Sequence, residues 1–205
     1  MNAAECLRIL REIKDCAFAT VDEHGAPEVR IIDVMLVENG ALYFCTSRGK
    51  DFHAQLERDG RVAITGLNKN WQSVRLTGTA RRLDNQRGWI DRIFEDNPSM
   101  NGVYPGESRY ILDAYVIDSG ELEFFDLGVT PINRESFTLG DAEARTKGFV
   151  ISDACIGCGL CAANCPQQCI REGTPYEIDQ SHCLHCGLCA ENCPAGAIWR
   201  RGEAK

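Results

Sequence analysis

The chain has 205 residues and a formal net charge of −8 at pH 7, and this length fits one large domain or two modest ones. An acidic chain without a basic patch argues against a nucleic-acid partner. The sequence also lacks a run of about 18 apolar residues, which argues against a membrane span. Residues 1–14 carry five charged side chains and no apolar leader core, so we expect a cytoplasmic protein with reduced cysteines.

Residues 1–127 are predicted to form a domain rich in β-strands. Asn2 is a candidate cap for a short leading helix through Lys14, because Glu5 follows three residues later and apolar residues recur on one side. Asn39-Gly40 is a strong hairpin signal. The predicted strands are 16–21, 29–37, 41–45, 61–67, 73–83, 110–116 and 121–127, and the further predicted helices are 51–58 and 85–95. Short antiparallel strands with few helices predict a barrel.

Side chains suited to a phosphate group gather where the strand 41–45 runs into a helix. Thr46-Ser47-Arg48-Gly49-Lys50 supplies hydroxyl groups and cations at the helix start, and Arg30 lies on a neighbouring strand. A mononucleotide phosphate needs cations and hydroxyl or amide donors at one place. The alternative interpretation is that this segment is a solvated polar turn.

These segments, together with Val74-Arg75-Leu76-Thr77-Gly78-Thr79-Ala80, make residues 5–127 resemble the FMN-binding split-barrel family of pyridoxamine 5'-phosphate oxidase and its relatives. The resemblance implies an antiparallel split β-barrel, hence a mainly β fold, and a homodimer with FMN near the subunit interface. By the same resemblance, the FMN-binding residues are Arg30, Thr46, Ser47 and Lys50 at the phosphate, Ile31 and Ile32 beside the ring, and Ser73 at the ring with Gln72 as its neighbouring alternative. Arg48 is added to the FMN-binding residues because it lies among these donors.

Two features depart from the oxidases of that family. Met35 stands where those oxidases carry a second cationic phosphate ligand. The chain end also lacks the Arg-x-x-Pro pattern that holds pyridoxal phosphate in them. The sequence therefore predicts a relative of the oxidase with another activity, not a typical pyridoxamine 5'-phosphate oxidase.

Residues 128–147 mix proline, glycine and charged residues, so we expect a linker there that has room for a short strand near Phe137. This linker would separate a domain at 1–127 from a domain at 148–205. A tether of this length would allow the C-terminal domain to dock on its own subunit or on the partner subunit.

Nine of the twelve cysteines follow residue 150, and eight of them repeat one pattern. Cys-x-x-Cys-x-x-Cys-x-x-x-Cys-Pro begins at Cys155 and again at Cys183, which marks an internal duplication. In a duplicated run of this kind, the first three cysteines bind one iron-sulfur cluster. The fourth cysteine, before the proline, binds the cluster of the other half. The two predicted ligand sets are therefore Cys155, Cys158, Cys161 and Cys193, and Cys183, Cys186, Cys189 and Cys165. Structural zinc and disulfides are the less favoured alternatives.

Residues 149–199 resemble a bacterial two-cluster 4Fe-4S ferredoxin domain, and both halves match without a missing ligand. The resemblance implies a small α+β domain with two 4Fe-4S clusters at the C-terminal end of the chain. Cys169 aligns with Ala197 in the repeat and is interpreted as a buried core thiol rather than a ligand. His185 is interpreted as a solvated loop residue, with tuning of a nearby cluster as the alternative.

The sequence supports two main functional hypotheses. The first is an iron-sulfur flavoprotein oxidoreductase that passes electrons between the clusters, FMN and an unidentified small molecule, with a redox protein or small molecule as its electron donor or acceptor. The flavin would carry the chemistry, so we name no catalytic side chain. The second is a dimeric electron carrier or redox sensor without a substrate of its own. A haem-binding split barrel is a weaker third hypothesis.

Overall fold

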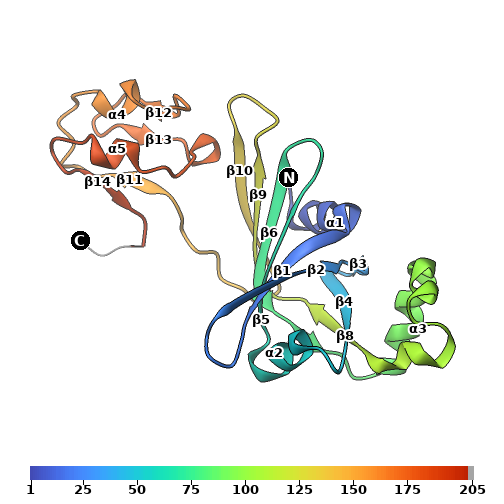
Figure 1. Ribbon diagram of the computed structural model, residues 1–205. Coiled ribbons are helices and arrows are strands. Elements are labelled where there is room, and N and C mark those ends of the chain that lie inside the picture. Colours follow the sequence, from blue (N-terminus) through green and yellow to red (C-terminus); the bar gives the residue numbers. More distant parts are fainter. Residues whose placement is uncertain (203–205) are drawn as a thin grey trace. The chain divides into compact units, whose positions relative to one another are not determined.

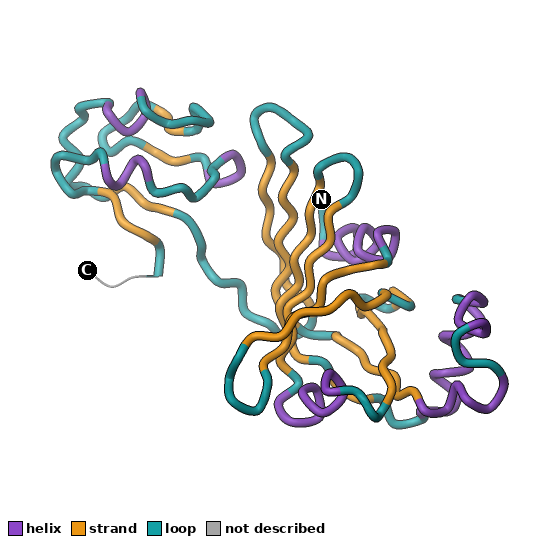
Figure 2. The backbone as a smooth tube through the Cα atoms, in the orientation of Figure 1, coloured by secondary structure: helices purple, strands orange, loops and turns teal. Residues whose placement is uncertain are grey.

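The computed structural model describes residues 1–202 (Figure 1; Figure 2). It separates into two compact units, and each is described by itself. The first unit comprises Met1–Lys69, Ser73–Phe124 and Ser136–Ala144. The second comprises Asn70–Gln72, Phe125–Glu135 and the described residues from Arg145 on. Within residues 1–202, no helix is both long and apolar enough to span a membrane.

The strands of the N-terminal part form two sheets. A six-stranded sheet has the order β10-β9-β6-β5-β1-β2, and a four-stranded sheet has the order β3-β4-β8-β7. The strands are β1 Asp15–Val21, β2 Pro27–Asp33, β3 Leu36–Glu38, β4 Ala41–Ser47, β5 Arg61–Leu67, β6 Gln72–Thr79, β7 Arg81–Arg82, β8 Leu112–Ile117, β9 Gly120–Asp126 and β10 Asn133–Leu139. The pairings β1–β2, β1–β5, β5–β6 and β4–β8 are all antiparallel, and the predicted mainly β class is confirmed.

The predicted strand 29–37 is in fact two strands with a corner between them. β2 ends at Asp33 in the six-stranded sheet, and β3 begins at Leu36 in the four-stranded sheet. At the corner, the Val34 N–H donates to the Lys14 carbonyl and the Met35 N–H donates to the Tyr43 carbonyl, each at 2.9 Å. Val34 thus bonds to the residue before β1, and Met35 bonds to β4. The chain passes from the six-stranded sheet to the four-stranded sheet between these two residues.

Three α-helices of the described chain pack against the strands of the two sheets. α1 covers Ala3–Ile13, α2 Asp51–Asp59 and α3 Gln86–Asp96, followed by the 3-10 helices η1 Pro98–Gly102 and η2 Gly106–Ile111. The Asn2 side chain caps α1 by accepting from the Glu5 N–H at 2.9 Å, as the sequence predicts. The predicted strand 110–116 starts later, at Leu112, because η2 occupies the preceding residues.

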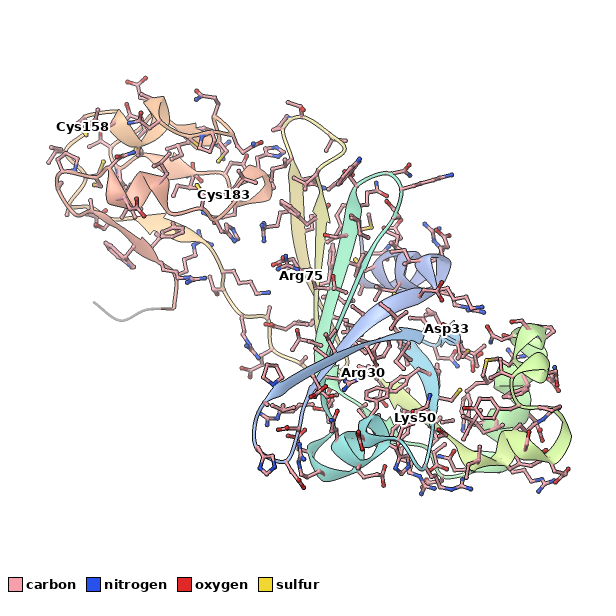
Figure 3. The ribbon with its side chains drawn as sticks, viewed as in Figure 1. Arg30, Asp33, Lys50, Arg75, Cys158 and Cys183 are labelled. Atoms are coloured by element: carbon pink, nitrogen blue, oxygen red, sulfur yellow. The ribbon has the colours of Figure 1, made fainter. Side chains whose placement is uncertain are left out.

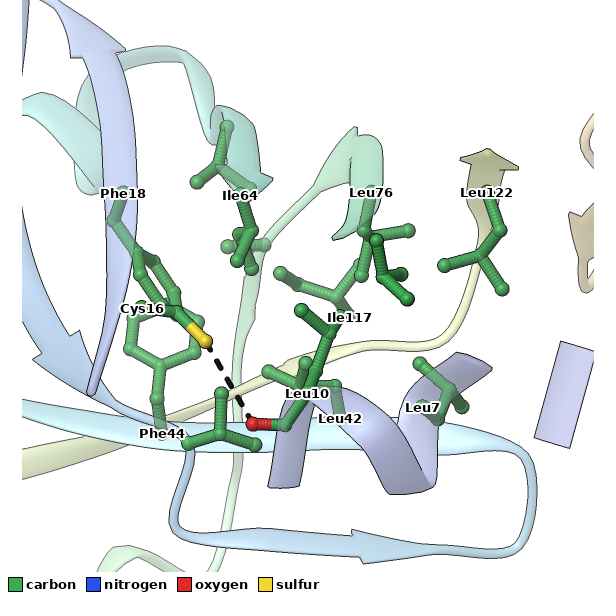
Figure 4. Close-up of a cluster of buried hydrophobic side chains, with 14 of the residues drawn as sticks. Leu7, Leu10, Cys16, Phe18, Leu42, Phe44, Ile64, Leu76, Ile117 and Leu122 are labelled. Atoms are coloured by element: carbon green, nitrogen blue, oxygen red, sulfur yellow. Dashed lines mark hydrogen bonds between the residues drawn. The ribbon is translucent and has the colours of Figure 1, made fainter. Parts of the chain in front are cut away.

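The first unit has two buried apolar clusters, and Figure 4 shows the one that includes α1. Leu7 and Leu10 of α1 are fully buried, and Phe18 of β1 meets Phe44 of β4 edge to face at 5.1 Å between ring centroids. The Cys16 thiol lies 3.6 Å from the Leu10 carbonyl, and its burial raises the pKa of Cys16 to about 12. This cysteine is therefore a neutral core side chain.

The C-terminal part of the second unit consists of two similar halves. Its elements are β11 Phe149–Ile151, α4 Leu160–Ala163, β12 Ile170–Arg171, β13 Glu177–Ile178, η3 Gln180–His182, α5 Leu188–Glu191 and β14 Ile198–Arg200. β11 pairs with β14, and β12 pairs with β13, both antiparallel. The buried apolar residues are chiefly isoleucines, and much of the remaining core is made of cysteines.

The segment expected to be a linker, 128–147, contains strand β10, and the short strand expected near Phe137 is therefore present. The turn between β9 and β10 groups with the second unit, whereas Ser136–Ala144 groups with the first. The boundaries of the compact units differ from the predicted domain boundaries at residues 127 and 148. The predicted domain boundaries stay a prediction.

Candidate functional site

The first unit carries a cavity of about 740 Å³ between strand β2 and the start of helix α2. Arg30 comes to it from β2 and Lys50 from the residue before α2; Figure 3 labels both. The full lining is Asp22, Glu23, Glu28, Val29, Arg30, Ile31, Ile32, Gly49, Lys50, Asp51, Phe52, Ala54, Gln55 and Arg58. A cavity of this size has room for a cofactor-sized ligand.

Arg30 is held in place by neutral groups. Its guanidinium donates to Thr20 Oγ1 at 2.5 Å and to Gln55 Oε1 at 2.9 Å, and it lies 4.7 Å from the centre of the Phe52 ring. Among residues 1–202, no carboxylate forms an ion pair with it. Burial lowers the pKa of Arg30, and the charges of Glu28 and Asp51 offset part of that effect. A cation that is partly desolvated and lacks a counterion is well suited to an anionic ligand.

Lys50 precedes helix α2 at the same cavity. Its backbone is extended, and no side chain of the described residues caps the helix. The first N–H groups of a helix have no intrahelical partner, so they carry partial positive charge toward this end. Lys50 and the uncapped helix start therefore add a second positive group to Arg30, which fits a phosphate.

Half of the residues predicted to hold FMN line this cavity: Arg30, Ile31, Ile32 and Lys50. Thr46, Ser47, Arg48 and Ser73 do not. Thr46 is buried, and its hydroxyl has no hydrogen-bond partner within the described part of the chain. Ser47 is the last residue of β4, and Ser73 lies on β6 opposite Leu67. Their predicted contacts with FMN stay predictions.

The guanidinium of Arg48 faces a buried carboxylate, and its predicted contact with FMN stays a prediction. Asp113 on β8 is 1% exposed and lies 3.2 Å from Arg48 Nη1, 2.9 Å from His53 Nε2 and 2.8 Å from Arg82 Nε. Burial raises the pKa of Asp113, but the hydrogen bonds from Arg82, His53 and Arg48 outweigh it and hold this pKa below its usual value. Arg48 therefore anchors the loop before α2 to β8.

Thr20, Gln55 and Arg58 also belong to this site, and none of them was predicted from the sequence. Gln55 and Arg58 lie on the same side of α2 as Asp51, and this helical spacing is a signal that could have found them. Thr20 could not be found this way, because only the pairing of β1 with β2 brings it beside Arg30.

The second unit contains two cavities lined by cysteines. One is lined by Cys155, Cys158, Cys161 and Cys193, with Ile151, Tyr176 and Ile198 among its apolar walls. The other is lined by Cys183, Cys186, Cys189 and Cys165 and also by Cys169, with Phe149, Ile170 and Ile178 among its apolar walls. The structure thus brings together the same two sets of four cysteines that the sequence predicts, each with its fourth member from the other half of the repeat.

The surroundings of these thiols fit iron-sulfur clusters. The His185 N–H donates to Cys183 Sγ and the Ala197 N–H donates to Cys193 Sγ, both at 3.3 Å. Burial raises the pKa of Cys189 to about 11, so a thiolate there needs a positive partner such as iron. Among residues 1–202, no group of three or more Cys, His, Asp or Glu is arranged to hold a single metal ion.

Comparison with protein families gives one match for each part of the chain. Residues 3–97 match the family "Pyridoxamine 5'-phosphate oxidase", and residues 154–197 match the family "4Fe-4S dicluster domain". The chain joins a pyridoxamine 5'-phosphate oxidase-like domain to a 4Fe-4S dicluster ferredoxin domain. We call these two parts the oxidase-like domain and the ferredoxin domain, and both resemblances seen in the sequence are confirmed.

Relatives of known sequence or structure agree with this division. The ferredoxin domain is 52% identical over 33 residues to a ferredoxin of Butyribacterium methylotrophicum, and 58% identical over 31 residues to one of Thermoanaerobacterium thermosaccharolyticum. These stretches are 16% and 15% of this chain, and they span only 60% and 56% of the two ferredoxins.

Solved structures similar to this chain share the fold of the oxidase-like domain. A nimC/nimA family protein from Clostridium acetobutylicum is 25% identical with a TM-score of 0.57, over 67% of this chain and 92% of that protein. A heme binding protein from Mycobacterium smegmatis is 18% identical with a TM-score of 0.51, over 66% of this chain and 57% of that protein. The predicted antiparallel split barrel is thereby confirmed.

Proposed function

We propose that this protein is an iron-sulfur flavoprotein oxidoreductase. It passes electrons between two 4Fe-4S clusters and a bound FMN, and from there to or from a small molecule. The proposal rests on two observations in one chain. Each of two cavities is lined by one of the predicted sets of four cysteines. A third cavity holds Arg30 and Lys50, which have no carboxylate partner among residues 1–202.

The phosphate of FMN is assigned to Arg30, Lys50 and the start of α2. The guanidinium of Arg30 is oriented by Thr20 and Gln55, which leaves its charge unneutralised. Ile31 and Ile32 line the same cavity and would offer an apolar wall to the ring. Arg48 has a supporting role here, since its bond to Asp113 fixes the loop that carries Lys50.

The eight cysteines of the repeat are assigned as cluster ligands in the two crossed sets. When bound, the clusters would supply single-electron transfer and FMN would supply two-electron transfer to a small molecule. The protein groups around the clusters are main-chain N–H donors and apolar side chains, which set the exposure and the hydrogen bonding of the cysteine sulfurs.

A homodimer is part of the proposal. β2 is an edge strand of the six-stranded sheet, and its side chains Val29 and Ile31 are 68% and 63% exposed although both are apolar. Both also line the cavity. An exposed apolar edge strand favours pairing with another copy of the chain, and such pairing would cover the cavity from the side of β2.

An anaerobic reductive titration tests the proposed electron transfer. In protein loaded with both cofactors, full reduction should take about four electrons per chain, one for each cluster and two for FMN. Reduction of the clusters should be followed by reduction of FMN without an added mediator. A control titration with an added redox mediator shows whether electrons prefer FMN or the clusters at equilibrium. If they prefer FMN, clusters that stay reduced beside oxidised FMN without the mediator would contradict the proposal.

A further inference from the structure

One of the two cysteine cavities contains a fifth thiol. Cys169 lines the cavity of Cys183, Cys186, Cys189 and Cys165. Its side chain is buried, with 6% of the residue exposed, and its Sγ lies 3.5 Å from Cys165 Sγ. The sequence favours a core thiol at this position, but the structure places the sulfur at the cavity wall beside a predicted ligand.

The duplicated half of the domain lacks this thiol. Ala197 stands at the position of the repeat that corresponds to Cys169, and it is fully buried. Its N–H donates to Cys193 Sγ at 3.3 Å, and no other cysteine of the described chain lines the cavity of Cys155, Cys158, Cys161 and Cys193. The two cavities therefore differ in the number of sulfur atoms, five against four, while the ligand pattern around them is the same.

The backbone holds Cys169 at the cavity. Its carbonyl accepts from the Asp179 N–H at 2.8 Å, and the next residue, Ile170, pairs with Ile178 where β12 meets β13. Cys169 thus lies immediately before a paired strand, whereas Cys165 follows the short helix α4. The fifth sulfur would keep its place when Cys165 is absent or detached.

We propose that Cys169 is a reserve ligand for the iron that Cys165 binds, an inference that rests on the proposed cluster ligation. When the bond between iron and Cys165 breaks, the Cys169 thiol releases its proton to solvent and its sulfur binds the same iron. The detached Cys165 thiolate takes up a proton. No electron is gained or lost in this exchange, and the number of cysteines that bind the cluster stays at four.

The duplication provides the matched control for a test. In the full chain purified without oxygen, Cys165→Ala should retain about eight irons and eight sulfides, because Cys169 replaces the lost ligand. Cys193→Ala removes the corresponding cysteine of the other set and should lose about half of both, because Ala197 offers no sulfur. The double variant Cys165→Ala/Cys169→Ala should lose as much iron as Cys193→Ala.

Spectroscopy of the reduced protein gives a second measurement. The electron paramagnetic resonance spectrum of Cys165→Ala should show two clusters, one with an altered signal because its ligand geometry has changed. Cys169→Ala alone should keep about eight irons and both original signals, because Cys165 remains in place.

Several results would overturn the reserve role. They are loss of iron or of folded structure in Cys165→Ala equal to that in Cys193→Ala, retention of all iron in the double variant, and loss of iron in Cys169→Ala alone. Failure of the underlying assignment looks different. Wild-type protein without iron, or Cys193→Ala with all its iron, would contradict the proposed cluster ligation itself.

Discussion

Arg30 and Arg61 lie in the same sheet but differ in whether a carboxylate neutralises their charge. Arg61 is exposed, and its guanidinium forms a 2.8 Å ion pair with Asp59. The acceptors around Arg30 are a hydroxyl, an amide and main-chain carbonyls, so its positive charge stays available. The side chain with an available charge is the one that lines the large cavity.

Replacement of Arg30 should weaken FMN binding without unfolding the protein. Arg30→Ala removes a charge-assisted hydrogen bond to phosphate worth about 1.5–3 kcal/mol, so the Kd for FMN should rise roughly 10- to 150-fold. Fluorescence titration of flavin-free protein measures this change. Arg61→Ala is the matched control, and an unchanged Kd in Arg30→Ala would remove Arg30 from the site.

A ligand cysteine should behave differently from a core cysteine. Cys161→Ala should lose about half of the iron and loosen the ferredoxin domain, because metal binding and folding are coupled there. Cys6, buried in the core of the first unit, serves as the control, since Cys6→Ala should keep its iron. Iron and circular dichroism are the readouts, and full iron content in Cys161→Ala would refute its role as ligand.

At the scale of elements, the loop before α2 depends on a buried carboxylate. Asp113 of β8 contacts Arg48 in the loop, His53 in α2 and Arg82 in β7. Three elements therefore meet at one side chain that is almost completely buried. Lys50 is two residues from Arg48, so the position of its ammonium group depends on this contact.

Neutralising Asp113 should loosen the loop. Asp113→Asn weakens hydrogen bonds to three cationic or ionisable groups, which should lower the free energy of unfolding by about 1.5–3 kcal/mol and also raise the Kd for FMN. Asp118→Asn is the control, because Asp118 forms an exposed pair with Arg81. Urea unfolding and flavin titration measure both effects, and an Asp113→Asn protein with wild-type flavin affinity would contradict the positioning role.

The sequence indicates the elements better than it indicates how they meet. The Asn2 cap and the strand β4 could be predicted because each depends on local spacing. The two cysteine runs are also visible as local spacing, whereas their crossed pairing was predicted from the behaviour of such repeats. The corner at Val34 and the turn of Arg48 toward Asp113 depend on partners far away in the chain. Such partners leave no periodic signal in the sequence, and so these features could not be predicted.

At the scale of the whole molecule, the two units have different kinds of core. Phe18, Phe44 and Tyr115 are among the large apolar side chains in the first unit. The ferredoxin domain has few apolar side chains of this size, and its core includes Cys161, Cys169 and Cys183. A small core rich in cysteine depends on its metal for stability.

Removal of iron should therefore affect one unit and spare the other. After chelation under reducing conditions, amide hydrogen exchange should increase strongly in β11 and β14, because their pairing depends on the cluster-bound core. Exchange in β4 and β8 should change little. Equal loss of protection in both pairs of strands, or in neither, would contradict the view that only the ferredoxin domain depends on iron.

The most direct test of the central proposal is the cofactor content of protein purified without oxygen. Iron, acid-labile sulfide and flavin should be measured on the same sample, together with an absorbance spectrum. We predict about eight irons, eight sulfides and one FMN per chain. Protein that holds no flavin when FMN is supplied, or that binds iron without sulfide, would contradict the iron-sulfur flavoprotein assignment.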